Sequence, residues 1–202
     1  VNMVPLDMEY GTVTAERYEK LVLQMKEANI NLVRVWGGGL IEDEEFYRLC
    51  DRHGLMVWQE FIQSSSGLDN VPSQKPEFLA LLQRAAETAV KTIRNHGCHV
   101  FWCGGNEVQK ARNKPVTAED PNIRLLAEIV ERYDPGKQFL PTSAYGPREF
   151  LNIDFPGENY DVHGPWKYEG VRREYEVFNA SDSLLHSEFG CDGLTNAETI
   201  RA

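Results

Sequence analysis

The chain contains only four cysteines in 202 residues, and no two of them form a Cys-x-x-Cys pair. Disulfide-rich scaffolds and zinc ribbons depend on more cysteines or on that spacing. His96, Cys98, His99 and Cys103 lie close in sequence, but on an expected strand His99 and Cys103 point to one face and Cys98 to the other. We therefore expect buried thiols, no metal site and no cofactor.

Positive charge is also scarce, with 21 Lys and Arg against 31 Asp and Glu, which gives a net charge of −10. Nucleic acids and anionic membranes are bound by basic surfaces, so we expect neither as a partner. No run of about 18 apolar residues could cross a bilayer. A soluble protein is expected, and the compartment stays open, with the periplasm and the extracellular space both compatible.

A phosphate-binding glycine loop is missing as well. Trp36 is followed by Gly37-Gly38-Gly39, but Leu40-Ile41-Glu42 comes next. The third glycine of the Gly-x-Gly-x-x-Gly fingerprint is therefore absent, which disfavours a doubly wound, nucleotide-binding sheet.

What the sequence does contain is a regular alternation of strand and helix patterns, with 42% hydrophobic residues to fill a core. Apolar, β-prone runs predict strands at 1–4, 31–36, 55–61, 100–103, 139–142, 160–163 and 183–190. Helical spacing predicts helices that begin near 14, 42, 77, 120 and 196. We expect one domain over 1–202 with an α/β fold, an incomplete TIM (β/α)8-type barrel with about seven strands present and the last strand missing.

Two of these strands end on a glutamate. The strand at 100–103 runs through Gly104-Gly105 into Asn106-Glu107, and the last strand runs through Glu188 into a glycine. Because a barrel collects its strand ends at one mouth, we expect the two carboxylates to share a site. Paired carboxylates are the equipment of glycoside hydrolysis. The alternative for Glu107 is an ordinary acidic residue in the first turn of a helix.

Aromatic and polar residues near the same strand ends fit a carbohydrate substrate. Indole rings pack against the apolar faces of sugars, although a core uses them too. Arg34 is either a cation that keeps a nearby carboxylate ionised or a member of a surface salt bridge. His163 is either a ligand for a hydroxyl group or a structural histidine. The tryptophans that we expect in the site are Trp36, Trp58, Trp102 and Trp166.

Several segments resemble the catalytic barrel of glycoside hydrolase family 2, most closely its β-mannosidase branch: 2–7, 29–61, 94–107 and 187–190. The resemblance implies that Glu107 is the general acid/base and Glu188 the nucleophile of a retaining exo-β-glycosidase acting on terminal β-mannosides. It also implies that Asn106 binds the 2-hydroxyl of the sugar and that Arg34 supports the nucleophile. The Trp36 triglycine run favours mannosides.

The chain departs from the family pattern in places. Gly97 stands where proline is usual, and Glu60 stands where aspartate is common. The segment 161–170 follows the pattern loosely, so Tyr160 and Tyr168 are both candidates for the tyrosine that contacts the nucleophile. An exo-β-glucosaminidase or β-galactosidase of the same family, and a non-catalytic carbohydrate-binding barrel, remain alternatives.

Members of the family are multidomain proteins in which β-sandwich domains precede the barrel. The start at Val1-Asn2-Met3 is typical of a position inside a longer protein. We therefore expect the chain to be a fragment of such a protein, without its β-sandwich domains and with little or no activity on its own.

Overall fold

The computed structural model describes residues 1–64, 70–112, 114–191, 193 and 197–201. The chain divides into two compact units, Val1–Tyr145 and Gly146–Ala202. Each unit is described by itself below.

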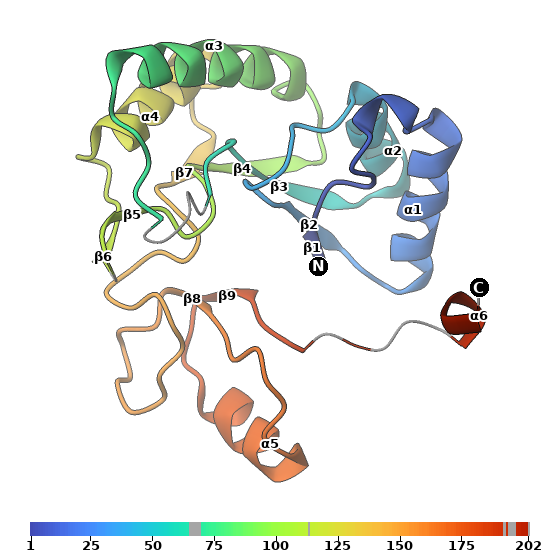
Figure 1. Cartoon of the computed structure of the whole chain (residues 1–202), viewed down its shortest axis with the longest axis vertical. Helices are drawn as coiled ribbons and strands as arrows, with labels where there is room; N and C mark the ends of the chain where they lie inside the picture. The colour runs from blue at the N-terminus through green and yellow to red at the C-terminus, as the bar shows by residue number, and fades with distance from the viewer. Residues whose placement is uncertain (65–69, 113, 192, 194–196, 202) are drawn as a thin grey trace. The chain divides into compact units, whose positions relative to one another are not determined.

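A five-stranded parallel sheet forms the centre of the first unit, in the order β1-β2-β3-β4-β7 (Figure 1). Its strands are β1 (Asn2–Met3), β2 (Leu32–Val35), β3 (Met56–Glu60), β4 (His99–Cys103) and β7 (Gln138–Leu140). A short antiparallel pair, β5 (Gln109–Ala111) and β6 (Lys114–Pro115), follows β4. Consecutive parallel strands need crossover connections, and helices provide most of them.

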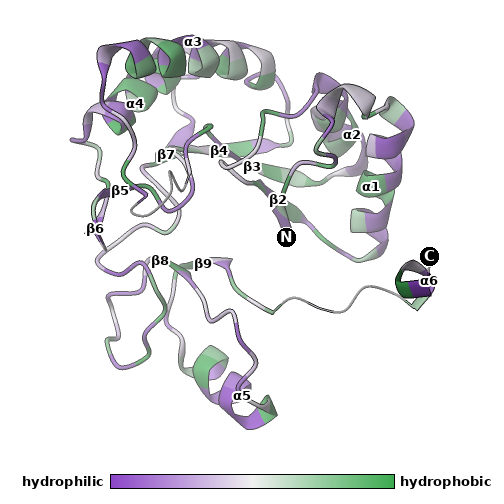
Figure 2. Ribbon diagram, in the orientation of Figure 1, coloured by the Kyte–Doolittle hydropathy of each residue, from purple (hydrophilic) through white to green (hydrophobic). Residues whose placement is uncertain are grey.

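The helices of this unit are the short 3₁₀ helix η1 (Tyr10–Thr12), α1 (Ala15–Glu27), α2 (Glu44–His53), α3 (Pro76–Ile93) and α4 (Pro121–Tyr133). Each α-helix buries one stripe of side chains and exposes the other, so polar and apolar residues alternate along the ribbons in Figure 2. Thr14 caps α1 through a hydrogen bond from the Arg17 amide, and Asp43 caps α2 through the Glu45 amide. Gly54 ends α2 in the left-handed conformation.

The sheet has two faces that differ in character. Val33, Val35, Val57 and Trp102 belong to the hydrophobic core cluster, together with side chains of all four α-helices. Successive strand residues point to opposite faces, which turns Arg34 and the residues paired with it in register away from that core. This polar face of the sheet carries Arg34 and Trp58, two of the residues expected in the site.

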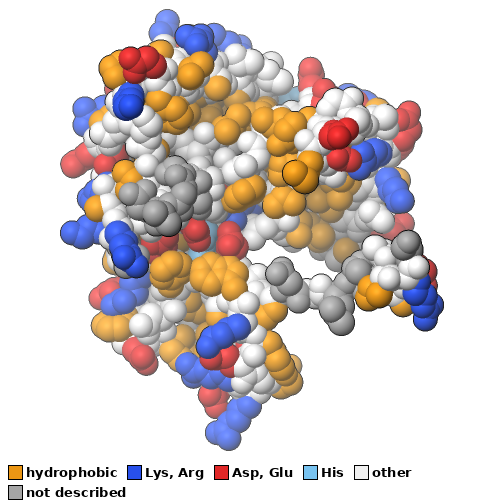
Figure 3. Space-filling view, viewed as in Figure 1, with side chains coloured by type: hydrophobic (Ala, Val, Ile, Leu, Met, Phe, Trp, Pro, Cys, Tyr) orange, Lys and Arg blue, Asp and Glu red, His pale blue; other side chains and the backbone are white. Residues whose placement is uncertain are grey.

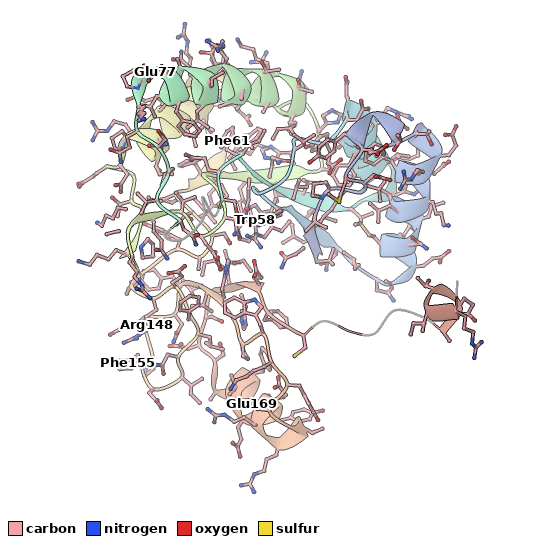
Figure 4. The ribbon with its side chains drawn as sticks, in the orientation of Figure 1. Trp58, Phe61, Glu77, Arg148, Phe155 and Glu169 are labelled. Atoms are coloured by element: carbon pink, nitrogen blue, oxygen red, sulfur yellow. The ribbon has the colours of Figure 1, made fainter. Side chains whose placement is uncertain are left out.

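The second unit contains a two-stranded parallel sheet, β8 (Asp161–His163) and β9 (Leu185–Glu188), with α5 (Val171–Ala180) between them in sequence. A short helix, α6 (Ala197–Arg201), follows. Arg148 stacks over the ring of Phe155 at 3.5 Å and pairs with Glu158 at 2.8 Å (Figure 4). No residue of α5 is buried.

The seven strands expected from the sequence are all present, five in one sheet and two in the other. No strand pairing in the described part of the chain joins these sheets into a closed barrel. The sequence analysis missed α5 and the β5–β6 pair. Residues 65–69, which follow β3, and the expected helix start at Asn196 lie outside the described residues. Among the described helices, none has the length and apolar content that a membrane span requires.

Candidate active site

The loop Gly104–Glu107 leaves the carboxyl end of β4 and is held from both sides. On one side the Asn106 amide donates a hydrogen bond to the carbonyl of Gln63, at 2.9 Å. On the other side the Glu107 amide donates to the carbonyl of Ser143, and Glu107 has a positive φ of 50°. A glutamate in the left-handed region is uncommon and is kept there by its surroundings.

A buried ion pair fixes the side chain of Asn106. Arg34 is 3% exposed, and its guanidinium donates to Asn106 Oδ1, to Asn2 Oδ1 at 3.1 Å and to Glu60 Oε1 at 2.8 Å. The other carboxylate oxygen of Glu60 accepts the Gly37 amide at 2.7 Å. The sequence left open a surface salt bridge for Arg34, and that alternative is wrong because both partners are buried.

The close approach at Gly37 explains part of the triglycine run. A Cβ at this position would lie 2.6 Å from the Phe61 carbonyl oxygen and 2.7 Å from that of Gln63. Only glycine therefore lets the chain after β2 pass beside the ends of β3 and β4. The family resemblance links the Trp36 triglycine run with a preference for mannosides. In the structure, Gly37 has a packing role.

The second carboxylate of the expected pair, Glu188, lies at the end of β9 in the second unit. The indole Nε1 of Trp166 donates to Glu188 Oε1 at 3.0 Å, and Nδ1 of His163 lies 3.8 Å from Oε2. His163 is fully buried, whereas Trp166 is 47% exposed and leaves ring surface for a ligand. Trp166 therefore contacts Glu188 directly, and the role suggested for Tyr160 or Tyr168 stays a prediction.

The tryptophans of the first unit do not share one role. Trp58 lies on the polar face of the sheet, with the Arg34 guanidinium 5.6 Å from its ring centroid, but it is only 2% exposed and offers little surface to a sugar, contrary to the expectation. Figure 4 shows Trp58 and Phe61 on opposite sides of β3. Trp36 is half-buried and packs against Gly38, where an added Cβ would meet its ring at 2.0 Å.

Trp102 requires a correction. Its side chain is 0% exposed, stacks on Phe61 with ring centroids 4.8 Å apart and donates from Nε1 to Asp134. It belongs to the core on the helix side and offers no surface to a sugar. Trp58 pairs in register with Phe101, so the next residue, Trp102, points to the opposite face. Alternation of side chains along the strands was the signal that could have separated these tryptophans.

Three polar residues that the sequence analysis did not place in the site turn out to shape it. Glu60 was noted only as a departure from the family pattern, yet it is the buried partner of Arg34. Gln63 contacts the loop after β4 from one side. Thr142 contacts it from the other, because its hydroxyl donates to the Gly105 carbonyl at 3.2 Å and accepts the Val108 amide at 2.9 Å.

Asp51, His96 and Cys98 offer potential metal ligands within 4.8 Å of one another. In the structure Asp51 accepts the Cys98 amide at 2.7 Å and lies 2.6 Å from Nδ1 of His96. Burial raises the pKa of the Cys98 thiol well above its usual value, whereas a metal would need the thiolate. These contacts fit an anchor for the chain entering β4 better than a metal site.

An apolar cavity of about 230 Å³ lies beside α3, away from the polar face of the sheet. Figure 3 shows hydrophobic side chains gathered at the surface between α3 and α2. The lining residues include Ile41, Phe61, Ile62, Phe78 and Leu82, and none of the lining side chains is ionisable. The cavity therefore supplies no acid, base or nucleophile.

The sequence resembles known proteins over most of its length. Residues 9–139 match the family model described as glycosyl hydrolases family 2, TIM barrel domain. The chain is 30% identical to the β-mannosidase B proteins of Aspergillus fumigatus and Aspergillus terreus, over 98% of its own length and 25% of theirs. It therefore spans about a quarter of the length of these curated relatives.

Solved structures give the same fold. The β-D-mannosidase of Dictyoglomus thermophilum matches 88% of this chain with a TM-score of 0.65 and 26% identity, over 25% of its own chain. An FMN-binding β-glucuronidase from Facaelibacterium prausnitzii L2-6 matches 91% of this chain and 28% of its own, with a TM-score of 0.63 and 16% identity. The second likeness concerns the fold alone.

Proposed function

The chain belongs to glycosyl hydrolases family 2, and on that premise we propose that it carries the catalytic residues of a retaining exo-β-glycosidase for terminal β-mannosides. One observation carries the proposal: Asn106-Glu107 stands at the carboxyl end of a parallel strand, and the side-chain oxygen of Asn106 accepts a hydrogen bond from Arg34 of the buried Arg34–Glu60 pair. Strand ends of this kind carry the active sites of such barrels. The names of the relatives at 30% and 26% identity support mannosides over other sugars.

In the proposed reaction Glu188 attacks the anomeric carbon while Glu107 protonates the leaving oxygen. The product is a covalent glycosyl-enzyme ester and the free aglycone. Glu107, now ionised, removes a proton from water, which attacks the anomeric carbon and releases Glu188. The two inversions give net retention, and this mechanism requires carboxyl groups about 5 to 5.5 Å apart.

The surrounding side chains have separate roles in this proposal. Asn106, held by Arg34, binds the 2-hydroxyl of the sugar, where hydrogen bonds strengthen in the transition state. The indole N–H of Trp166 fixes the orientation of the Glu188 carboxylate, and its exposed ring packs against the sugar. His163 supports Glu188 from the other side, and Trp36 offers a second aromatic surface.

A panel of aryl β-glycosides, tested on the full-length natural protein that contains these residues, decides the substrate. We expect the highest kcat/KM on the β-mannoside, ahead of the β-glucosaminide and β-galactoside. Preference for either of the other two would overturn the mannoside assignment. Sugar binding measured by calorimetry, without covalent trapping by a 2-fluoro glycoside, would favour a non-catalytic carbohydrate-binding barrel.

Substitution of the glutamates tests the mechanism. Glu188→Ala should lower kcat by roughly 10³-fold or more, because a nucleophile is lost. Added azide should then give the α-mannosyl azide by a single inversion. Glu107→Ala with azide should give the β-mannosyl azide, because azide attacks the glycosyl-enzyme. Glu176→Ala, on the exposed face of α5, is the matched control and should keep the wild-type rate. A Glu188→Ala variant with wild-type activity would show that the nucleophile is another residue.

A further inference from the structure

Gln63, the third residue after β3, is buried and contacts the loop after β4 at two points. Its side-chain Nε2 donates to the Gly104 carbonyl at 2.9 Å, and its own carbonyl accepts the Asn106 amide at 2.9 Å. The two contacts flank Gly105. The residue therefore holds the three positions that lead into Glu107.

Gly105 fits Gln63 so closely that neither can change freely. A Cβ on Gly105 would lie 2.4 Å from the Gln63 carbonyl oxygen and 2.8 Å from its Cβ, and the φ of Gly105 is 149°. On the opposite side, a Cβ on Gly104 would lie 2.2 Å from the Pro141 carbonyl oxygen. The loop is thus clamped between the ends of β3 and β7.

The far end of the Gln63 side chain connects the clamp to α4. Oε1 of Gln63 accepts a hydrogen bond from Nδ2 of Asn122 at 2.9 Å, and Nδ2 also donates to the Ser73 carbonyl at 3.0 Å. Asn122 lies buried in the first turn of α4. Only a side chain with one donor and one acceptor at its tip can serve both Gly104 and Asn122, which a carboxylate or a thioether cannot do.

We propose that Gln63 is a positioning residue that sets the direction of the Glu107 carboxyl for proton transfer, an inference that rests on the proposed function. General acid catalysis requires the proton donor within hydrogen-bond reach of the leaving oxygen. A misplacement of about 1 Å by a change away from the chemistry costs roughly 10²-fold in rate. Gln63 does not touch the reacting atoms in this proposal, and it acts through Gly104 and Asn106.

Leaving groups of different basicity separate this role from a merely structural one. A dinitrophenolate departs without a proton, whereas a phenolate depends on the acid. For Gln63→Met we expect kcat/KM on phenyl β-mannoside to fall roughly 10²-fold. On 2,4-dinitrophenyl β-mannoside we expect a change of less than about threefold, because acid catalysis contributes little there. If the panel of aryl β-glycosides shows a preference for another sugar, the phenyl and 2,4-dinitrophenyl glycosides of that sugar replace the two mannosides.

Gln59→Met is the matched control. Gln59 is a buried glutamine of β3 that accepts from the Tyr47 hydroxyl at 2.6 Å and donates to the Glu60 carbonyl at 2.8 Å. It contacts no residue of the loop Gly104–Glu107 through these bonds. We expect Gln59→Met to lower the melting temperature as Gln63→Met does, but to affect both aryl glycosides equally.

Amide hydrogen exchange gives a readout that does not depend on activity. Gln63→Met should speed exchange at Asn106 and Glu107 at least tenfold relative to β2 and β3, and Gln59→Met should not. An equal loss on both aryl glycosides together with unchanged local exchange would overturn the role of Gln63. Wild-type protein that hydrolyses no aryl glycoside would instead overturn the proposed function, and hydrogen exchange would still decide whether Gln63 positions the loop.

Discussion

At the scale of the residue, Arg34 carries a buried positive charge that needs hydrogen-bond partners. Removing a guanidinium from water costs several kcal/mol unless its donors find partners. Arg34 meets Glu60, Asn2 and Asn106, and the ring of Trp58 lies 5.6 Å away. A buried ion pair such as Arg34–Glu60 adds little net stability compared with apolar residues of similar size. Because Arg34 also bonds Asn106, we infer that the pair serves to fix the orientation of the Asn106 side chain.

His99 gives a prediction about pH. The side chain is buried against Trp102, and burial, helped by the positive charge of Lys137, lowers the pKa of His99 from 6.5 to about 4. Between these values the unfolded chain binds a proton that the folded chain does not bind. Stability therefore falls as the pH drops from 6.5 towards 4, by up to about 3 kcal/mol from this residue.

Urea unfolding at intervals between pH 4 and pH 7 measures this contribution. His99→Phe should be less sensitive to pH across that window than the wild type. His53→Gln, which removes a histidine from the end of α2, serves as the control and should leave the His99 contribution in place. Equal pH dependence in His99→Phe and the wild type would contradict the assignment.

At the scale of the element, α2 illustrates how local signals define both ends of a helix. Asp43 Oδ1 accepts the Glu45 amide at 2.9 Å, and Gly54 ends the helix with φ of 74°. We expect Asp43→Ala to lower the free energy of unfolding by about 1 kcal/mol, because a capping bond is lost. Gly54→Ala should lower the free energy of unfolding by about 1 to 2 kcal/mol, because a residue with a Cβ disfavours the left-handed region. No steric clash adds to this cost, since nothing lies within 4 Å of an added Cβ.

Gly97→Ala is the control for these variants. Gly97 has ordinary space around it, with Asp51 Oδ1 at 3.8 Å from an added Cβ, and it does not have a positive φ. In chemical denaturation we expect the free energy of unfolding of Gly97→Ala to stay within about 0.5 kcal/mol of that of the wild type. A Gly54→Ala variant as stable as Gly97→Ala would show that the end of α2 relaxes without cost.

The elements that the sequence predicted well share strong local patterns. The helix expected to begin near 77 and the strands expected at 31–36 and 55–61 correspond to α3, β2 and β3 within a few residues. By contrast, α5 was missed because none of its side chains is buried. The helix expected to begin near 120 is α4, and Asp120 stands at its N-cap position, but the Asp120 carboxylate accepts from the Thr117 amide at 2.7 Å and makes no capping bond.

At the scale of the whole molecule, apolar burial is distributed unevenly between the two units. The described residues of both hydrophobic clusters all lie in the first unit. Among the described residues of the second unit, Val162 is the buried hydrophobic side chain. Because local stability follows buried apolar contact, we expect α5 and β9 to open at least about 2 kcal/mol more easily than β3 and β4.

Native-state hydrogen exchange tests this difference. Amides of α5 should exchange early, and amides of β3 and β4 should exchange last. The amides of α3, which buries five residues in the core of the first unit, serve as an internal reference for a protected helix. If α5 exchanged as slowly as α3, the second unit would be stabilised by more than its buried side chains provide.

The order of strands and helices, the family, and the two glutamates at strand ends follow from the amino-acid sequence alone, because periodicity and short motifs are local. Which residues share a face of the sheet became clear from the folded arrangement of the strands. That arrangement buried Trp102 among the helices, brought Glu60 to Arg34 and closed Gln63 around Gly105. These outcomes depend on the register between strands, and no single segment of the chain encodes that register.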